Sequence, residues 1–378
     1  MSMTGETVVE PCKACPWPVA MVDGIFTQND GVSARLIKEG AGHPNFRIMV
    51  VADANVVNSN RGLGSRIGRY FQDNGLTLGA SPILFTGGEK LKSDNLLSAM
   101  NMFSMALRGE SAGINNVVVA IGGGSLLDLA GYAAAQIHGG MRLVRVPTTL
   151  SSMVEGACTN KAYVNFDRVK SALAVDSRPV AAIVDPALAS TCLDGVWRGG
   201  MGEIIRHAAV ADAKLMKDIA KSAKAISARD MDAAREIVRK ALVSRAKKGT
   251  TDFAVWCSHR LEELSAFKLP NGYAIAIAIC LECAYSVAKG HLNEDAQELI
   301  CRAMADCGAL EGLHHSQHLI QKPNAILDGI KVWLARSGST SRTLPAGPGK
   351  NICEPKLDFE TYRMVLKKFL NATTGAQS

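Results

Sequence analysis

The sequence feature that most constrains the fold is a run of three glycines between a buried strand and a helix. Asn116–Ile121 is an apolar run typical of a buried β-strand, and Gly122–Gly124 follows it directly. Ser125–Gln136 then has helical length. Glycine lets a backbone approach a ligand closely, and the first N–H groups of a helix favour an anion. The turn therefore suits a pyrophosphate, although many tight strand–helix connections have the same pattern without binding anything.

Strands and helices alternate on both sides of this turn. Four other apolar runs are typical of buried strands: Arg47–Ala52, Ile83–Thr86, Leu143–Val146 and Ala181–Val184. Stretches of helical length lie between them, namely Gly62–Asn74 and Ser93–Arg108. This alternation predicts an α/β Rossmann-like domain with a parallel sheet, whose ligand crevice lies at the carboxyl ends of the strands.

After about residue 190 the pattern becomes helical. The predicted helices are Glu203–Ala225, Asp230–Lys248, Ala274–Lys289, Glu294–Cys307 and Phe359–Leu370. Residues 1–45 and the Ser/Gly/Pro-rich residues 337–356 are expected to be irregular. We therefore predict an α/β domain over residues 1–190, an all-helical domain over residues 191–378, and an active site in the cleft between them.

Composition excludes several classes of protein. Apolar residues make up 47% of the 378 residues, which is enough for a sizeable core and excludes intrinsic disorder. The formal net charge of +7 comes from scattered basic residues, so we expect no nucleic-acid surface. No apolar stretch has the length of a membrane span without a charge, Gly or Pro, and no membrane association is expected.

Cysteine usage indicates a reduced, cytoplasmic protein. The N-terminal residues lack the apolar region of a secretory signal, so the ten cysteines are expected to be free thiols. Two CxxC pairs, Cys12–Cys15 and Cys280–Cys283, have the spacing of zinc ligands. However, Cys280–Cys283 lies inside the apolar run Tyr273–Val287, where small thiols simply pack, and we expect no zinc ribbon.

Several motifs occur in a characteristic order. They are GGGSxxDxxG at residues 122–131, Pro147–Leu150 (PTTL) and Gly200–Glu203 (GMGE), and Asp53 at the end of the first apolar strand precedes them. In this order the chain resembles the dehydroquinate synthase and sugar-phosphate cyclase superfamily, relatives of glycerol dehydrogenase and the iron-containing alcohol dehydrogenases. The resemblance runs from about residue 47 to 290, with a weaker tail to about 370.

The resemblance implies NAD as cofactor. Asp53 and Asn55 would lie on the adenosine ribose side, and Gly123, Gly124 and Ser125 would hold the pyrophosphate. The remaining NAD contacts implied by position are Glu89 and Lys92 of the family's GExxK turn, together with Asp128, Thr148, Thr149 and Lys170. Each residue alone has an ordinary structural explanation, such as a strand-ending turn or a solvated helix position. Together they predict an NAD site.

The metal site of the family is not conserved in this chain. In dehydroquinate synthase a zinc ion sits on a Glu and two His. Glu203 matches the Glu, but Val255 and Asn271 align with the two His. Valine cannot bind metal and an Asn oxygen is a poor zinc ligand, so we expect no normal zinc site. Glu203 would ligate a metal only in a rebuilt site.

One other histidine pattern has the spacing of possible metal ligands. His314, His315 and His318 form an HHxxH run. Neighbouring Gly312 and Pro323 favour an exposed turn over a metal site.

By the same resemblance, six residues are candidates for catalysis: Lys161, Glu155, Glu203, Arg206, His259 and Asn271. His259 is the best base by chemistry, and His207 beside Arg206 is a further candidate for proton transfer. Asp252 stands where the family has Asn, and its charge is expected to repel a phosphate dianion. The substrate is therefore expected to differ from a sugar 7-phosphate held in the usual way.

Three hypotheses follow. The first is a divergent, NAD-dependent, sugar-phosphate-cyclase-like lyase that oxidises a polyol or ketose transiently and then eliminates or forms a carbocycle, without being an authentic dehydroquinate synthase. The second is a metal-independent NAD oxidoreductase, or a lyase or isomerase, on the same scaffold. The third is a non-catalytic NAD-binding homologue. The partners expected are a small polar substrate and a second copy of the chain in a homodimer.

Overall fold

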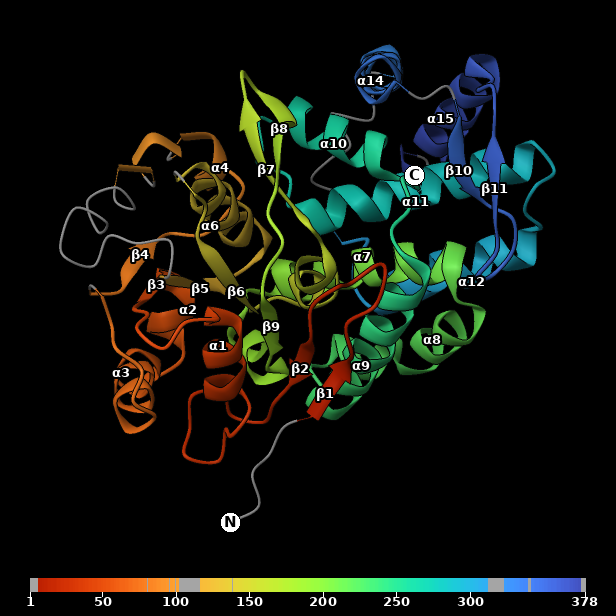
Figure 1. Ribbon diagram of the computed structural model, residues 1–378. Coiled ribbons are helices and arrows are strands. Elements are labelled where there is room, and N and C mark those ends of the chain that lie inside the picture. Colours follow the sequence, from red (N-terminus) through yellow and green to blue (C-terminus); the bar gives the residue numbers. More distant parts are fainter. Residues whose placement is uncertain are drawn as a thin grey trace. The chain divides into compact units, whose positions relative to one another are not determined.

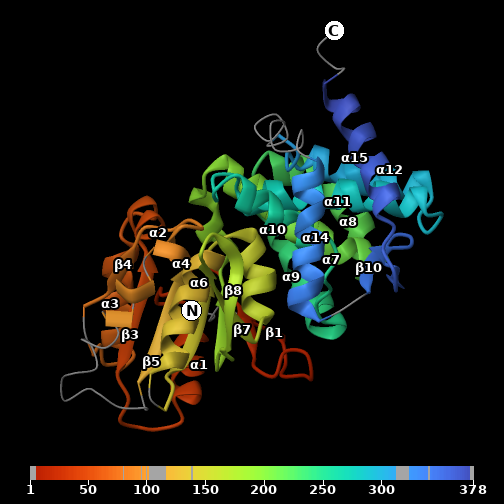
Figure 2. The same ribbon diagram turned by 90° about the horizontal axis from the view of Figure 1, so that it is seen from above.

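Contacts within the chain divide it into two compact units (Figures 1 and 2). Unit 1 comprises Met1–Leu193 with Arg245–Lys247, and unit 2 comprises Asp194–Ser244 with Lys248–Ser378. The computed structural model describes residues 6–79, 81–94, 96–98, 100–101, 116–137, 139–311, 323–338 and 341–374.

Unit 1 is built on a seven-stranded sheet in the order β1-β2-β9-β6-β5-β3-β4. Its strands are β1 (Glu6–Val9), β2 (Val19–Met21), β3 (Ile48–Asp53), β4 (Ile83–Phe85), β5 (Val117–Gly122), β6 (Arg142–Pro147) and β9 (Ala181–Val184). All pairs are parallel except the edge pair β1–β2. The five predicted strands are all present, and the predicted fold class, a parallel α/β domain followed by a helical domain, is confirmed.

Helices cover both faces of this sheet, which explains why its strands are continuous apolar runs. One apolar cluster joins Val50 and Val119 to helices α1 (Ser33–Ala41), α2 (Ala54–Ser59) and α3 (Leu63–Asp73). The alternate strand residues, such as Val51 and Val118, pack with α4 (Leu91–Asp94) and α6 (Gly124–Gln136). Most of the predicted helix Ser93–Arg108 lies outside the described residues.

The strand order reverses at β3. The chain passes from β3 outward to β4 and then returns to β5 on the other side of β3. Loops that leave β3 and β5 at such a point diverge, and ligands of doubly wound sheets bind between them. Asp53 ends β3 and Gly122 ends β5, so two of the predicted NAD-binding motifs begin at this reversal.

A second, smaller element of unit 1 was not predicted. The antiparallel hairpin β7 (Lys161–Phe166) and β8 (Val169–Asp176) follows a short π-helix, η1 (Ser152–Gly156). Asp167 and Arg168 turn the hairpin with φ angles of 48° and 61°. Left-handed non-glycine residues give no strong sequence signal, which is why the turn was missed.

Over its described residues, unit 2 is helical apart from one hairpin. Its helices are α7 (Asp194–Ala211), α8 (Ala213–Ser227), α9 (Met231–Lys248), α10 (Val255–Leu264), α11 (Asn271–Ala288), α12 (Glu294–Asp306), α14 (Pro323–Ser337) and α15 (Phe359–Thr374). The apolar helix α11 is long enough to cross a membrane by length and composition alone, but 72% of it is buried inside the protein. It is the core helix of this unit.

Three sequence-based expectations were wrong. Residues 1–45 contain β1, β2 and α1, and β2 extends the sheet alongside β9. The predicted helix Glu203–Ala225 is two helices, because Asp212 caps α8 by accepting from the Leu215 N–H at 2.9 Å. The loop at 337–356 contains a hairpin, β10 (Arg342–Pro345) and β11 (Asn351–Glu354).

Helices α7 and α11 approach so closely that only glycine fits where they meet. A Cβ on Gly272 would overlap the backbone of Gly199, and a Cβ on Gly202 would lie 2.9 Å from the Gly272 carbonyl oxygen. We predict that Gly272→Ala lowers the melting temperature by ~5 °C, because overpacking costs about 2 kcal/mol.

The matched control is Gly68→Ala in α3, where a Cβ meets nothing within 4 Å. This change should stabilise its unit by about 0.5–1 kcal/mol. Circular dichroism melts of both variants check the pair of predictions. Equal melting temperatures for Gly272→Ala and the wild type would contradict the close helix contact.

Candidate functional site

The first part of the candidate site is the turn where β3 ends. Asp53 caps α2 by accepting from the Asn55 N–H at 2.9 Å, and the same oxygen accepts from the Gly87 N–H at 3.2 Å. A Cβ at Gly87 would overlap the Asp53 carboxylate, so this position requires glycine. The carboxylate thus ties the loop after β4 to the end of β3.

The glycine turn after β5 is shaped for a ligand. Gly123 is the extended N-cap of α6, and a Cβ there would lie 3.2 Å from the Thr149 methyl group. Gly124 is exposed, and a Cβ there would meet nothing within 4 Å. Open space at the N-terminus of a 13-residue helix suits an anionic group such as a pyrophosphate.

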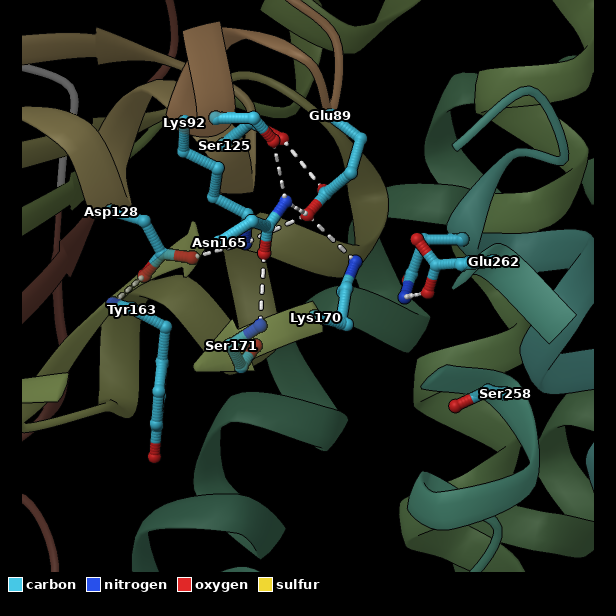
Figure 3. A network of polar contacts seen from close by, with 12 residues as sticks. Glu89, Lys92, Ser125, Asp128, Tyr163, Asn165, Lys170, Ser171, Ser258 and Glu262 are labelled. Atoms are coloured by element: carbon cyan, nitrogen blue, oxygen red, sulfur yellow. Dashed lines mark hydrogen bonds and ion pairs between the residues drawn. The ribbon is translucent and has the colours of Figure 1, made fainter. Parts of the chain in front are cut away.

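A charge network lies beside this turn and joins five of the predicted NAD-site residues (Figure 3). The Glu89 carboxylate receives Lys170 Nζ at 2.9 Å, Lys92 Nζ at 3.2 Å and the Ser125 hydroxyl at 3.1 Å. Lys92 also contacts Asp128 at 2.8 Å. The side chains of Glu89, Lys92 and Lys170 are 13%, 6% and 5% exposed, so the pairs are shielded from solvent.

Burial by itself would raise the pKa of Glu89, but the ammonium groups of Lys92 and Lys170, with a hydrogen bond from Asn165, lower this pKa to about 2. Asn165 donates to Glu89 at 3.0 Å and accepts from the Ser171 N–H at 2.9 Å. Asn165 was missed in the sequence because it lies in the unpredicted hairpin.

The threonine turn after β6, Thr148 and Thr149, lies next to the glycine turn. Thr148 N–H donates to the Gly122 carbonyl at 3.0 Å, which ties this turn to the glycine turn. The Thr149 hydroxyl donates to Ser152 at 2.8 Å at the start of η1. Thr148 is buried, and its hydroxyl oxygen has no hydrogen-bond partner among the described residues.

Two predicted catalytic residues of unit 1 lie close to these turns in the chain. Glu155 is in the π-helix, where it pairs with Arg245 Nε at 3.1 Å, and Arg245 is 5% exposed. π-Helical turns occur frequently at functional sites. Lys161 begins β7 and is exposed. The resemblance places Arg245 at a family Lys, but its pairing with Glu155 was not predicted, because the two residues lie 90 positions apart in sequence.

In unit 2, Glu203 and Arg206 lie one turn apart on α7. Arg206 Nε donates to Glu203 at 2.6 Å, and Arg206 Nη1 donates to the Thr251 carbonyl at 2.8 Å. Their side chains are 15% and 5% exposed. The carboxylate that matches the family's metal ligand is therefore paired with a guanidinium.

Asn271 begins α11, and its side-chain amide donates to the buried Glu262 at 3.0 Å. Val255 and His259 lie on α10, where both are partly exposed. His207 is buried, and its ring nitrogen pairs with Ser244 at 3.0 Å. The HHxxH run at His314, His315 and His318 lies outside the described residues.

The residues that align with the family's metal ligands are a poor donor set for zinc, because Val255 has no donor atom and Glu203 is paired with Arg206. A zinc site needs three or four N, O or S ligands, and among the described residues no group of three His, Cys, Asp or Glu side chains gathers. The two CxxC pairs give no such group among the described residues either, and Cys280 and Cys283 are buried in α11.

The charge of Asp252 is compensated, which the sequence did not reveal. Arg342 pairs with Asp252 at 3.3 Å, and Asp252 also accepts from the Thr343 N–H at 3.0 Å. Arg342 itself is fully buried and stacks over Trp333 at 4.0 Å. Because Arg342 offsets the negative charge of Asp252, this residue should repel a phosphate group less than the sequence alone suggests.

Comparisons with known proteins agree with this architecture. Residues 82–196 match the model of the 3-dehydroquinate synthase N-terminal domain, and residues 200–322 match that of the C-terminal domain. The chain belongs to the 3-dehydroquinate synthase family. A 3-dehydroquinate synthase of Pyrobaculum islandicum is 28% identical over 288 residues, which cover 73% of this chain and 82% of the relative.

Solved structures share the fold. ValA, a 2-epi-5-epi-valiolone synthase from Streptomyces hygroscopicus with NAD+ and Zn2+ bound, superposes with a TM-score of 0.80 at 21% identity, covering 97% of this chain and 99% of that one. A 2-deoxy-scyllo-inosose synthase complexed with carbaglucose-6-phosphate, NAD+ and Co2+ has a TM-score of 0.73 at 17% identity, covering 93% and 96%. At these identities the likeness shows the fold alone.

The shielded Glu89 network predicts a pH-dependent loss of stability. Glu89→Gln removes the carboxylate that the two buried ammonium groups share and leaves Lys92 with Asp128, which should cost about 3 kcal/mol at pH 7. The pKa of Glu89 is about 2 in the folded chain against its ordinary 4.5, so the stabilisation is complete above pH 4.5 and is lost as the pH falls towards 2.

Urea unfolding of both proteins at pH 7, 4.5 and 3 measures this difference, which should narrow below pH 4.5. The control is Glu236→Gln, which removes an exposed carboxylate paired with Arg239 and should cost under about 0.5 kcal/mol. A Glu89→Gln deficit that stays constant with pH would disprove the assigned charge network.

Proposed function

We propose that the chain is an NAD-dependent enzyme of the sugar-phosphate-cyclase type. It would oxidise a hydroxyl of a small polar polyol or ketose-type substrate transiently, and then eliminate a group or close a carbocycle. The observation that carries the proposal is the convergence of predicted NAD-site residues from four loops of unit 1 at the reversal of its sheet. The solved cyclases with NAD+ bound support it through their shared fold.

The residues present fit NAD. The open space at Gly124, the helix N-terminus behind it and the unpartnered Thr148 hydroxyl offer donors and room. Asp53 and Asn55 would hold the adenosine ribose, Gly123, Gly124 and Ser125 the pyrophosphate, and the Glu89 network with Thr149 the rest. When bound, NAD supplies a hydride acceptor and returns the hydride later.

The chemistry assigned to the chain's own residues is proton transfer and charge stabilisation. His259, partly exposed on α10, would accept the proton of the substrate hydroxyl at a ring nitrogen. Lys161, exposed at the start of β7, would stabilise negative charge on substrate oxygens, and Glu155, held by Arg245, would orient a hydroxyl. Val255 and Asn271 stand where the family has its zinc-binding histidines, and neither is a good zinc ligand. We therefore infer that a side-chain base, in place of a metal ion, promotes deprotonation of the substrate hydroxyl.

The same observation favours a second candidate, a metal-independent NAD oxidoreductase, or a lyase or isomerase, on this scaffold. An oxidoreductase consumes NAD, whereas a cyclase, lyase or isomerase recycles it. Net absorbance at 340 nm during turnover of a polyol or ketose panel separates these cases. A non-catalytic homologue would bind NAD without turning over any of them.

Gly124→Val is expected to abolish NAD binding without damaging the fold. The added side chain meets no protein atom at its Cβ, but it fills the space assigned to the pyrophosphate. Saturating NAD at 100 times its Kd should stabilise the wild type by about 2.7 kcal/mol and the variant not at all.

Thermal shift assays with and without NAD check this, with Gly64→Ala in α3 as the control, where the nearest atom to a Cβ is a Val57 methyl at 3.6 Å. If Gly124→Val kept the full NAD shift, the glycine turn would not be the pyrophosphate site. If the wild type showed no shift, the proposed function would fail.

Lys161→Met and His259→Gln are expected to lower kcat by about 100-fold or more, since each removes a group that acts on charge or a proton in the reaction. Both residues are partly or fully exposed, so melting temperatures and NAD binding should stay near wild-type values. Turnover, followed as product formation, measures the effect. Full activity in both variants would refute the assigned catalytic roles.

A further inference from the structure

The Glu203–Arg206 pair in α7 has a consequence for the metal that the relatives contain. We propose that the Arg206 guanidinium is a built-in replacement for the divalent cation, so that the Glu203 carboxylate keeps a fixed internal counter-ion. This inference deepens the proposed function, because it rests on the same site. It can nevertheless be tested without NAD or substrate.

Geometry fixes the guanidinium where it is. Nε donates to Glu203 at 2.6 Å, and Nη1 donates to the carbonyl oxygens of Thr251 at 2.8 Å and Phe253 at 3.5 Å. With only 5% of its side chain exposed, Arg206 cannot move aside without losing contacts to three partners. A metal ion approaching Glu203 would meet a held positive charge, which repels it.

The other two family ligand positions support the replacement. Val255 carries no donor atom in its side chain. The side-chain amide of Asn271 donates to Glu262, whose side chain is fully buried. This hydrogen bond holds the Asn271 side chain in place. Gly272, the next residue, lies directly against Gly199 of α7, so Asn271 and the Glu203 turn belong to one close helix crossing of unit 2.

The Glu203 carboxylate has a counter-ion, which it would lack in a chain that had only lost its metal. A largely buried carboxylate without a partner would be costly, and drift that removed the ligands would leave that cost behind. Here Glu203 has its cation on the same helix. Arginine suits this task better than lysine, because its planar fork can bond a carboxylate and backbone carbonyls at once.

The experiment rebuilds the metal site with and without Arg206. Val255→His with Asn271→His restores the family's ligand types at the two aligned positions, and a third change, Arg206→Ala, removes the guanidinium. Zinc affinity of each protein is measured by competition with a chromogenic chelator, on chelator-treated protein without NAD. We expect at most weak binding by the wild type, and binding at least about 30-fold tighter by the triple variant than by the double variant.

Adding Glu203→Gln to the triple variant should abolish the gain. Equal zinc affinity of the double and triple variants would overturn the proposal, because Arg206 would then not occupy the place of the metal charge. Stoichiometric zinc in the wild type that is lost in Glu203→Gln would overturn it as well.

Where the double histidine variant does not fold, judged by its thermal melt, Val255→His alone is compared with Val255→His carrying Arg206→Ala, since Glu203 and one histidine then offer a pair of ligands. The variant without Arg206 should bind zinc at least about tenfold tighter, and adding Glu203→Gln should remove the gain. Equal zinc affinity with and without Arg206 would overturn the proposal. A thermal shift with NAD is measured on the same samples. No shift would refute the proposed function, while the zinc affinities would still test the role of Arg206.

Discussion

The organisation of unit 1 depends on one buried guanidinium. Arg145 of β6 donates to the carbonyl oxygens of Gly156 at 2.9 Å, Thr159 at 2.6 Å and Ser177 at 2.9 Å. It thereby fastens the π-helix and both ends of the β7–β8 hairpin to the central sheet. Burial lowers the pKa of Arg145 to about 10, while the nearby Asp128 opposes this shift, so the group stays charged at pH 7. Glu155, Lys161 and Lys170 all sit on elements that this side chain holds.

The sheet adds the second constraint, because parallel strands deliver their loops to one edge. Once β3, β5 and β6 were recognised as strands, Asp53, the glycine turn and the threonine turn had to gather there. This is why apolar runs and motif order predicted the fold class, and why the residues proposed for NAD binding begin at the same edge of the sheet. The structure adds how they are joined, through the Gly87 N–H on Asp53 and the Thr148 N–H on the Gly122 carbonyl.

What could not be predicted depends on partners far away in sequence. Nothing near Glu155 indicates that Arg245 is its partner, and nothing near Asp252 indicates Arg342. The hairpin turn uses left-handed Asp167 and Arg168, which carry no glycine signal. The break between α7 and α8 was missed for the opposite reason: Asp212 is a strong cap, but helical periodicity on both sides hid it. Local patterns therefore predicted the central strands and most of the helices, whereas the charge pairs between distant residues could not be predicted.

The departures from the family pattern share a physical logic. The polar residues at these positions have partners within their own unit: the retained Glu203 has Arg206, and the altered Asn271 and Asp252 have Glu262 and Arg342. A chain that was only losing an old site would accumulate unpaired polar groups, and each would cost stability. Compensation at all three positions supports the proposal that the Arg206 guanidinium takes the place of the metal charge. A fixed guanidinium cannot ligate an alkoxide as a metal does, but it holds its charge at every physiological pH and cannot dissociate. A site of this kind needs a side-chain base for proton transfer. In the proposed function that base is His259, the partly exposed histidine of α10.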